Sequence, residues 1–115
     1  MPNLKYSRWK TITVAKDGTT SSEVDLEMPY RSLALVIPTI DSSTVTVSVA
    51  TSTGGTFQAL SYISLNDGDD DPAITSAATG AITVVFPVFG FQFFKVVCGS
   101  QQTTAAVTFY ARGFN

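Results

Sequence analysis

The sequence predicts an all-β chain that folds as a jelly-roll-like antiparallel β-sandwich of about eight strands. Three observations support this prediction. Apolar and polar residues alternate with a period of two along most of the chain, which places one face of each strand on a core. Residues with branched Cβ atoms and aromatic residues dominate these runs, as is typical of strands. Turn residues divide the runs at short intervals, and no stretch has the period of an amphipathic helix.

The alternation is clearest in three segments of the chain. In Ser22–Met28 the apolar residues alternate with three acidic residues, and in Thr44–Thr51 valines alternate with Thr and Ser. In Thr104–Arg112 the apolar Val107 and Phe109 share one face. The expected strands, in chain order, are Trp9–Ala15, Ser22–Met28, Leu33–Ile37, Thr44–Thr51, Thr56–Leu60, Ile82–Phe86, Phe91–Cys98 and Thr104–Arg112.

Glycine and aspartate residues mark the expected connections. Asp17-Gly18 predicts a tight hairpin after the first strand, and Gly54-Gly55 joins the fourth strand to the fifth. Asn66-Asp67-Gly68 begins a long acidic loop that ends at Pro72. The length of 115 residues fits one domain. Within it, residues 1–21 hold an N-terminal arm and the first strand with its hairpin, and residues 22–115 form the remainder of the sandwich.

Two expected strands are apolar on both faces. They are Leu33–Ile37 and much of Phe91–Cys98, where Phe91 and Phe93 share a face and Phe94 points the other way. A sandwich of two layers has no third layer to cover a second apolar face, so we expect at least one of these strands to lie in a subunit interface.

The composition excludes several classes of function. There is no His and only one Cys, so His-based catalysis, His metal sites and zinc sites built from several cysteines are excluded. A net charge of −2 disfavours binding to a nucleic-acid backbone. We expect no enzyme activity, no cofactor and no catalytic residue, and Cys98 is expected to be a buried, inert thiol. The apolar stretch around 82–98 contains Pro87, Gly90 and Lys95, so we expect no membrane span and no membrane partner.

One acidic cluster is a candidate metal site. Asp67, Asp69, Asp70 and Asp71 lie within five positions, and a Ca²⁺ ion would relieve their mutual repulsion. The ligand order of an EF-hand is missing, however, and a solvated acidic loop explains the same residues. We therefore assign no metal and keep the four aspartates as a calcium alternative.

The N-terminal arm is the candidate partner interface. Tyr6 and Trp9 lie beside the basic residues Arg8 and Lys10. Tyr, Trp and Arg dominate the energetics of protein interfaces, so these four residues predict a docking site for another protein. Exposed aromatic rings would also serve as a platform for a sugar, and a third interpretation places Trp9 in the core with the basic residues solvated.

The order of segments in residues 22–112 resembles the small all-β structural proteins of tailed bacteriophages, in particular head decoration (cement) proteins. The most specific pieces are the Gly-Gly-x-Phe turn at 54–57 and the phenylalanine-rich strand that ends Lys-Val-Val-Cys-Gly-Ser at 95–100. The second piece is similar to a recurrent F-x-x-L-K-V/L-R-S-G pattern, although Cys98-Gly99-Ser100 departs from its Arg-Ser-Gly ending.

This resemblance implies a structural virion protein that cements the outside of a capsid by bridging capsomers. The implied partners are the major capsid protein and further copies of the chain, as a homotrimer. The protein would be made in the host cytoplasm and would end on the capsid surface. Two alternatives stay open: a carbohydrate-binding or host-attachment module, with Trp9 and Tyr62 as test positions, and a phage neck or tail component.

Overall fold

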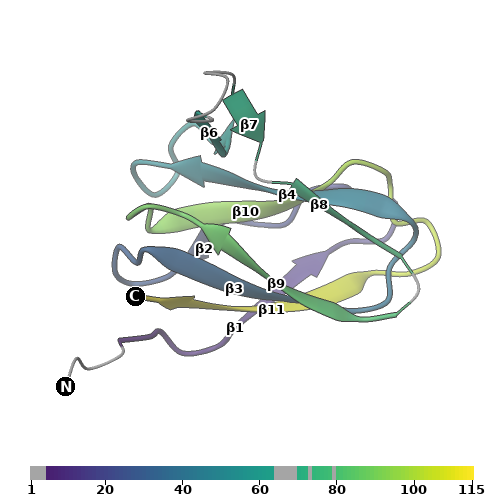
Figure 1. Ribbon diagram of the computed structural model, residues 1–115. Coiled ribbons are helices and arrows are strands. Elements are labelled where there is room, and N and C mark those ends of the chain that lie inside the picture. The colour runs from purple at the N-terminus through teal and green to yellow at the C-terminus, as the bar shows by residue number, and fades with distance from the viewer. Residues whose placement is uncertain (1–4, 64–69, 73, 79) are drawn as a thin grey trace.

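Two antiparallel sheets stack face to face in the computed structural model, which describes residues 5–63, 70–72, 74–78 and 80–115 (Figure 1). The described residues contain no helix, and none of them could therefore cross a lipid bilayer in helical form. The strands are β1 (Lys10–Val14), β2 (Val24–Asp25), β3 (Ser32–Ile37), β4 (Ser43–Ala50), β5 (Gln58–Ala59), β6 (Ser61–Ile63), β7 (Asp70–Pro72), β8 (Ile74–Ala77), β9 (Ile82–Pro87), β10 (Phe93–Cys98) and β11 (Val107–Phe114).

The strand order within the two sheets is that of a jelly roll. One sheet has the order β1-β11-β3-β9, and the other has the order β2-β10-β4, with β5 and β8 both paired to the far edge of β4. Because β5 and β8 share one place, eight strand positions remain, and neighbours along the chain mostly alternate between the sheets. The predicted all-β antiparallel sandwich is confirmed. A small third sheet, β6-β7, lies beyond β4 (Figure 1).

The core lies between the sheets and follows the period-two pattern of the sequence. In β3 and β10 every second residue is buried and the residues between them are half-buried. This alternation arises because successive side chains of a strand point to opposite faces. The largest fully buried side chains are Phe94, Phe109, Leu26, Leu33, Leu35, Ile37 and Gln102.

The hairpin predicted at Asp17-Gly18 is wrong. A turn does occur there, with Asp17 at φ 67° and Gly18 N–H donating to the Ala15 carbonyl at 2.9 Å. However, β1 pairs with β11, whereas residues after the turn cross to the other sheet, where Thr20 pairs with Val97. The turn residues specify a local reversal of the chain direction. Contacts between distant segments decide which strand the residues on each side of the turn pair with.

The expected strand Ser22–Met28 is much shorter than its pattern indicates. Only β2 pairs regularly, and the Asp25 carboxylate accepts a hydrogen bond from Glu27 N–H at 2.7 Å. This local bond supports a turn that holds Glu27 at φ 71°, outside the strand region. In contrast, the sequence pattern missed β6, β7 and β8, which are short and lie in or beside the expected acidic loop.

Residues 5–7 lie along β11 and do not form a free arm. Ser7 N–H donates to the Gly113 carbonyl at 2.8 Å, and Gly113 N–H donates to Ser7 Oγ at 2.9 Å. Asn115 N–H donates to the Lys5 carbonyl at 3.0 Å. At Gly113 an added Cβ would lie 2.5 Å from the ring of the buried Tyr30, so only glycine allows this close packing.

The exposed carboxylate of Asp41 ties the β3–β4 connection to the loop before β11. It accepts hydrogen bonds from Thr104 Oγ1 at 2.7 Å and from the backbone N–H groups of Thr104 at 3.0 Å and Thr103 at 2.7 Å. The bond from the Thr104 hydroxyl, followed by those backbone donors, holds the pKa of Asp41 below its ordinary value. The ionised form is therefore favoured by folding.

We expect this contact to make stability sensitive to acid. Because the folded-state pKa is depressed, its contribution is present above the ordinary aspartate pKa of about 3.9 and is lost as the pH falls through the folded value. We measure the urea midpoint of unfolding as a function of pH. In Asp41→Asn the fall of this midpoint at acid pH is expected to be smaller than in the wild type. Asp17→Asn is the control, since the described structure shows no donor to that carboxylate, and equal flattening by both variants would contradict the expectation.

Candidate functional site

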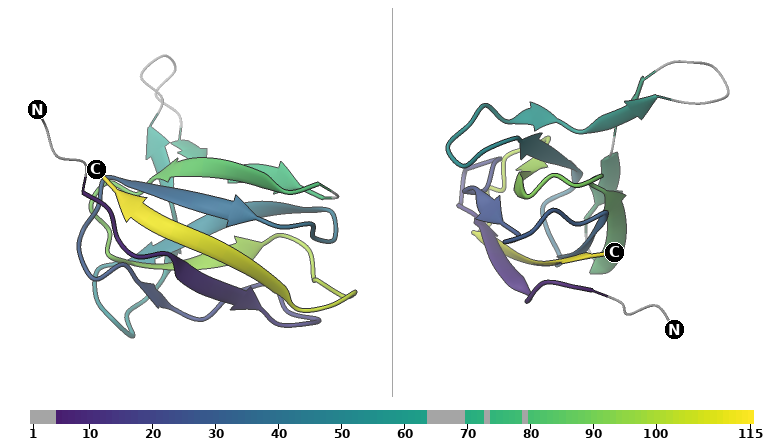
Figure 2. Two further views of the ribbon diagram at one scale, coloured as in Figure 1. Left: turned by 90° about the horizontal axis from the view of Figure 1, so that it is seen from below. Right: turned by 90° about the vertical axis from the view of Figure 1, so that its left-hand side faces the viewer.

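The outward side of the β1-β11-β3-β9 sheet forms the candidate site, which we call the aromatic face (Figure 2, left). Cross-strand pairing arranges its side chains in rows. Arg112 lies opposite Ala34 and Ala34 opposite Val85, while Tyr110 is paired with both Thr11 and Val36. The residues of the aromatic face are Tyr6, Trp9, Thr11, Ala34, Val36, Thr83, Val85, Tyr110 and Arg112.

Large apolar side chains on the aromatic face are open to solvent. The exposed fractions are 54% for Tyr6, 47% for Trp9, 58% for Val85 and 48% for Tyr110. Scattered exposed apolar residues are normal on a soluble domain, but here they share one face with Thr, Ala and a single cation. No described residue covers them, so the sandwich presents an aromatic sheet face that carries the charge of Arg112 to its surroundings.

An irregularity in pairing brings Tyr6 and Trp9 to the same side. Lys10 pairs with Ala111, whereas Tyr6 pairs with Phe114. Three residues, 7–9, therefore lie opposite the two residues 112–113, which is the pattern of a β-bulge. Without the bulge, residues three apart would point to opposite faces. With it, both rings flank the same side chain of β11.

That side chain is Arg112, whose guanidinium lies over both rings. The guanidinium carbon is 4.5 Å from the centroid of the Tyr6 ring and 4.7 Å from that of the Trp9 ring. Both distances lie within the range of cation–π attraction. Tyr6, Trp9 and Arg112 form what we call the arginine clamp. It joins the first described residues of the chain to the last strand.

The structure separates the four residues predicted as a partner interface. Tyr6 and Trp9 come together in the arginine clamp. Arg8 is exposed, and the half-buried Lys10 pairs with Glu27 at 3.2 Å. The sequence prediction did not include Arg112 or Tyr110. Their signal was present, because the alternation in 107–112 places both on the solvent side of the last strand.

The outward side of the other sheet has a different character. Glu23 and Asp25 lie there beside Lys95, whose ammonium is 4.6 Å from the centroid of the Phe57 ring. Hydrogen bonds from Thr53 Oγ1 and Gly54 N–H lower the pKa of Glu23. Those from Gln92 Nε2 and Glu27 N–H lower the pKa of Asp25. Both groups are therefore held as anions on the face opposite the arginine clamp.

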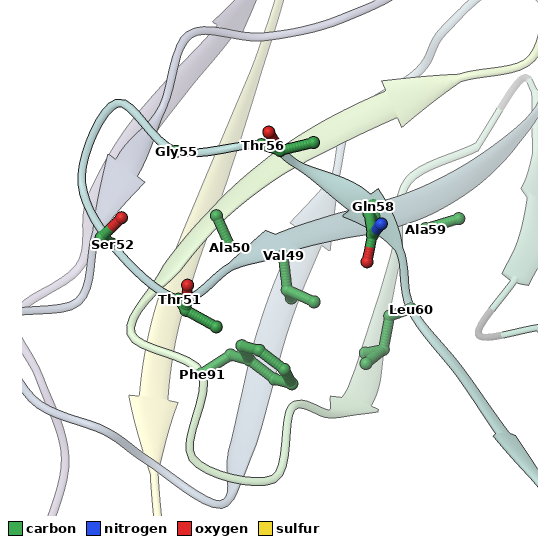
Figure 3. Close-up of a pocket in the computed structure, with 10 residues that line it drawn as sticks. All are labelled: Val49, Ala50, Thr51, Ser52, Gly55, Thr56, Gln58, Ala59, Leu60 and Phe91. Carbon is green, nitrogen blue, oxygen red and sulfur yellow. The ribbon is translucent and has the colours of Figure 1, made fainter.

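A pocket of about 480 Å³ opens beside the β4–β5 hairpin (Figure 3). Val49, Leu60 and Phe91 supply its apolar wall, and Gln58 supplies an amide. None of the described residues that line it carries a titratable side chain. The hydroxyls of Thr51, Ser52 and Thr56 also line it, so the described lining offers packing and hydrogen bonds from hydroxyls and an amide.

The remaining candidates contribute no assembled site. Asp67 and Asp69 lie outside the described residues, and for Asp70 and Asp71 only the backbone in β7 is described. Among the described residues, no group of three or more acidic, Cys or His side chains could hold a metal ion. Cys98 is buried as predicted, and burial raises the pKa of its thiol. The side chain of Tyr62 also lies outside the described part.

Comparisons with known proteins reveal a shared fold. No protein-family model matches the chain, and no curated protein matches it significantly. The SPBc2 prophage-derived protein YomS is 16% identical, with a TM-score of 0.58 over 100% of this chain and 97% of that one. The tobacco streak virus coat protein is 10% identical, with a TM-score of 0.50 over 98% of this chain and 87% of that one.

A chain from the cyanophage Pam1 capsid is 16% identical, with a TM-score of 0.46 over 97% of this chain and 84% of that one. Phage and viral proteins with an all-β fold are therefore among the structural neighbours of this chain. At such low identities the likeness is one of fold alone.

Proposed function

We propose that this chain is a structural component of a phage particle that decorates the outside of the capsid and has no enzymatic activity. The observation that carries the proposal is the aromatic face, where Tyr6, Trp9, Val85 and Tyr110 are exposed around one cation. A face of this composition is suited to contact with another protein, because Trp, Tyr and Arg supply most interface hot spots. The proposed partner is the major capsid protein.

The fold supports the same proposal. The jelly-roll strand order occurs in viral capsid domains, and the prophage and coat proteins named above share the architecture. We further propose that the chain bridges capsomers as a homotrimer, as the resemblance to cement proteins implies. Several contacts with a repeating lattice would then add to firm attachment, even where each contact is weak.

The geometry of the arginine clamp favours protein docking over sugar binding. A sugar stacks on the open face of an aromatic ring, but Arg112 occupies one face of both Tyr6 and Trp9. The guanidinium therefore reduces the aromatic surface that a sugar would meet. A neck or tail component would dock through the same aromatic face. It would differ from a capsid decoration protein only in the partner that it binds.

The test is binding to heads of the parent phage that lack this protein. We expect the purified chain to sediment as an oligomer and to pellet with the heads. Trp9→Ala should weaken binding by at least about 30-fold, the equivalent of a hot-spot loss of about 2 kcal/mol. Bound and free fractions are measured by sedimentation over a range of head concentrations.

The control is Phe57→Ala, which removes an aromatic ring that lies beside Lys95 on the outward side of the other sheet. It should bind as the wild type does. A monomer without affinity for heads contradicts the proposal. Binding to tails or necks in place of heads would contradict a capsid position and support the neck or tail alternative. Specific binding to a glycan array that is lost in Trp9→Ala would support the carbohydrate alternative.

A further inference from the structure

The guanidinium of Arg112 has no partner for its hydrogen-bond donors among the residues that the structure describes. Its Nε atom is buried and makes no hydrogen bond. The described residues also provide no carboxylate within ion-pair distance of it, and the ion pair observed near the clamp joins Lys10 to Glu27. An arginine carries five N–H donors in a fixed fork, so Arg112 has donors that no described residue occupies.

The arginine clamp holds this fork ready for a ligand. The rings, whose centroids lie 4.5 and 4.7 Å from the guanidinium carbon, contact the guanidinium and restrict its movement. A free arginine loses considerable side-chain freedom when it binds, and stacking against rigid rings removes part of that loss in advance. The surrounding Ala34 and Val85 offer no competing charge.

We propose that Arg112 recognises a carboxylate, an Asp or Glu side chain on the surface of the partner protein, and anchors the aromatic face to it. This inference rests on the proposed function, because it names the chemistry of the partner that the aromatic face meets. A carboxylate matches the guanidinium fork with two parallel hydrogen bonds. The uncharged residues around the clamp would exclude water from this pair and so strengthen it.

The charge distribution favours a protein carboxylate over other occupants. A nucleic acid would need several cations to displace its counterions, and the aromatic face has one, with Glu23 and Asp25 on the other side of the sandwich. A second copy docked face to face with its two-fold axis at the clamp would bring one Arg112 toward another and create repulsion between like charges. A partner whose carboxylate is surrounded by apolar residues would complement both the charge of Arg112 and the apolar side chains around it.

The first experiment measures binding to heads for three variants. Arg112→Gln removes the charge, and Arg112→Lys keeps the charge but loses the fork and the stacking. Both should weaken binding by at least about tenfold. Lys16→Gln is the control, since it removes an exposed cation in the turn after β1, at the other end of that strand from the clamp, and should change binding little. Wild-type binding by both Arg112 variants overturns the inference and leaves the proposed function standing.

The second experiment does not depend on heads. The NMR resonance of the Arg112 Nε–H, assigned from its absence in folded Arg112→Lys, is followed while a blocked peptide of Asp and Glu is added. We expect a saturable shift that a matched Asn and Gln peptide does not produce. Equal responses to both peptides overturn the inference, as does a response confined to inorganic phosphate or to a DNA oligonucleotide. If the wild type fails to bind heads but its resonance still responds to the acidic peptide, the proposed function fails and the carboxylate site remains.

Discussion

Phe109→Ala is expected to lower the free energy of unfolding by about 3–5 kcal/mol, the largest effect of any substitution considered for this chain. Phe109 is 0% exposed and points into the core from β11, the strand that lies between β1 and β3. Truncation removes buried apolar surface and leaves a cavity that a sheet held on both sides closes poorly. Since small domains are stable by about 5–15 kcal/mol, the loss would be a large share of the total.

Urea unfolding measures the effect, with the slope of the transition checked for two-state behaviour. Phe89→Ala is the control, because its ring is 62% exposed, and it should change stability by less than about 0.5 kcal/mol. A loss of less than about 1 kcal/mol in Phe109→Ala would contradict the view that the described core packs around this ring.

Gln102→Leu is expected to have the second largest effect, a loss of about 2–4 kcal/mol. The Gln102 side chain is 0% exposed although it is polar. Its Oε1 accepts a hydrogen bond from Asp41 N–H at 2.8 Å, and its Nε2 donates to the carbonyls of Asp41 at 3.2 Å and Ser100 at 3.3 Å. Leucine fills a similar volume but leaves these backbone groups without partners. Most of the loss in the free energy of unfolding arises because these buried groups are then unpaired.

The adjacent residue provides the matched comparison. Gln101 is exposed, so Gln101→Leu makes the same chemical change without breaking a buried network, and its midpoint should stay near that of the wild type. Gln102→Leu should also loosen the turn at 15–18, because Gln102 exchanges backbone hydrogen bonds with Asp17 and Gly18. The second measurement is amide hydrogen exchange, which we expect to be faster at Asp17 and Gly18 in Gln102→Leu. Equal stability of Gln102→Leu and Gln101→Leu would contradict a stabilising role for the buried hydrogen bonds of Gln102.

The alternation of apolar residues predicted the core well because it reports a local property. Leu33, Leu35 and Ile37 are buried since a strand turns every second side chain the same way, whatever its partner strand. The same pattern could not predict partners. The turn at Asp17-Gly18 has the residues of a hairpin, yet β1 pairs with the last strand, because pairing depends on contacts between distant segments.

The candidate site could be predicted only in part for a related reason. Tyr6 and Trp9 were identified by residue type, since aromatic rings beside basic residues indicate an interface. Their arrangement around Arg112 depends on a bulge that shifts the register by one residue, and no feature of the segment 5–10 alone specifies that shift. Arg112 itself belongs to the opposite end of the chain, so only the folded sheet brings the three side chains together.

The arginine clamp has a consequence for the folding of this chain. Tyr6 and Trp9 are separated from Arg112 by more than a hundred residues of sequence. The β1–β11 ladder joins the same distant segments, and such distant pairing is intrinsically slow. A partly folded chain in which this ladder has not formed lacks the clamp, so contact of the two rings with the guanidinium marks a completed β1-β11-β3-β9 sheet.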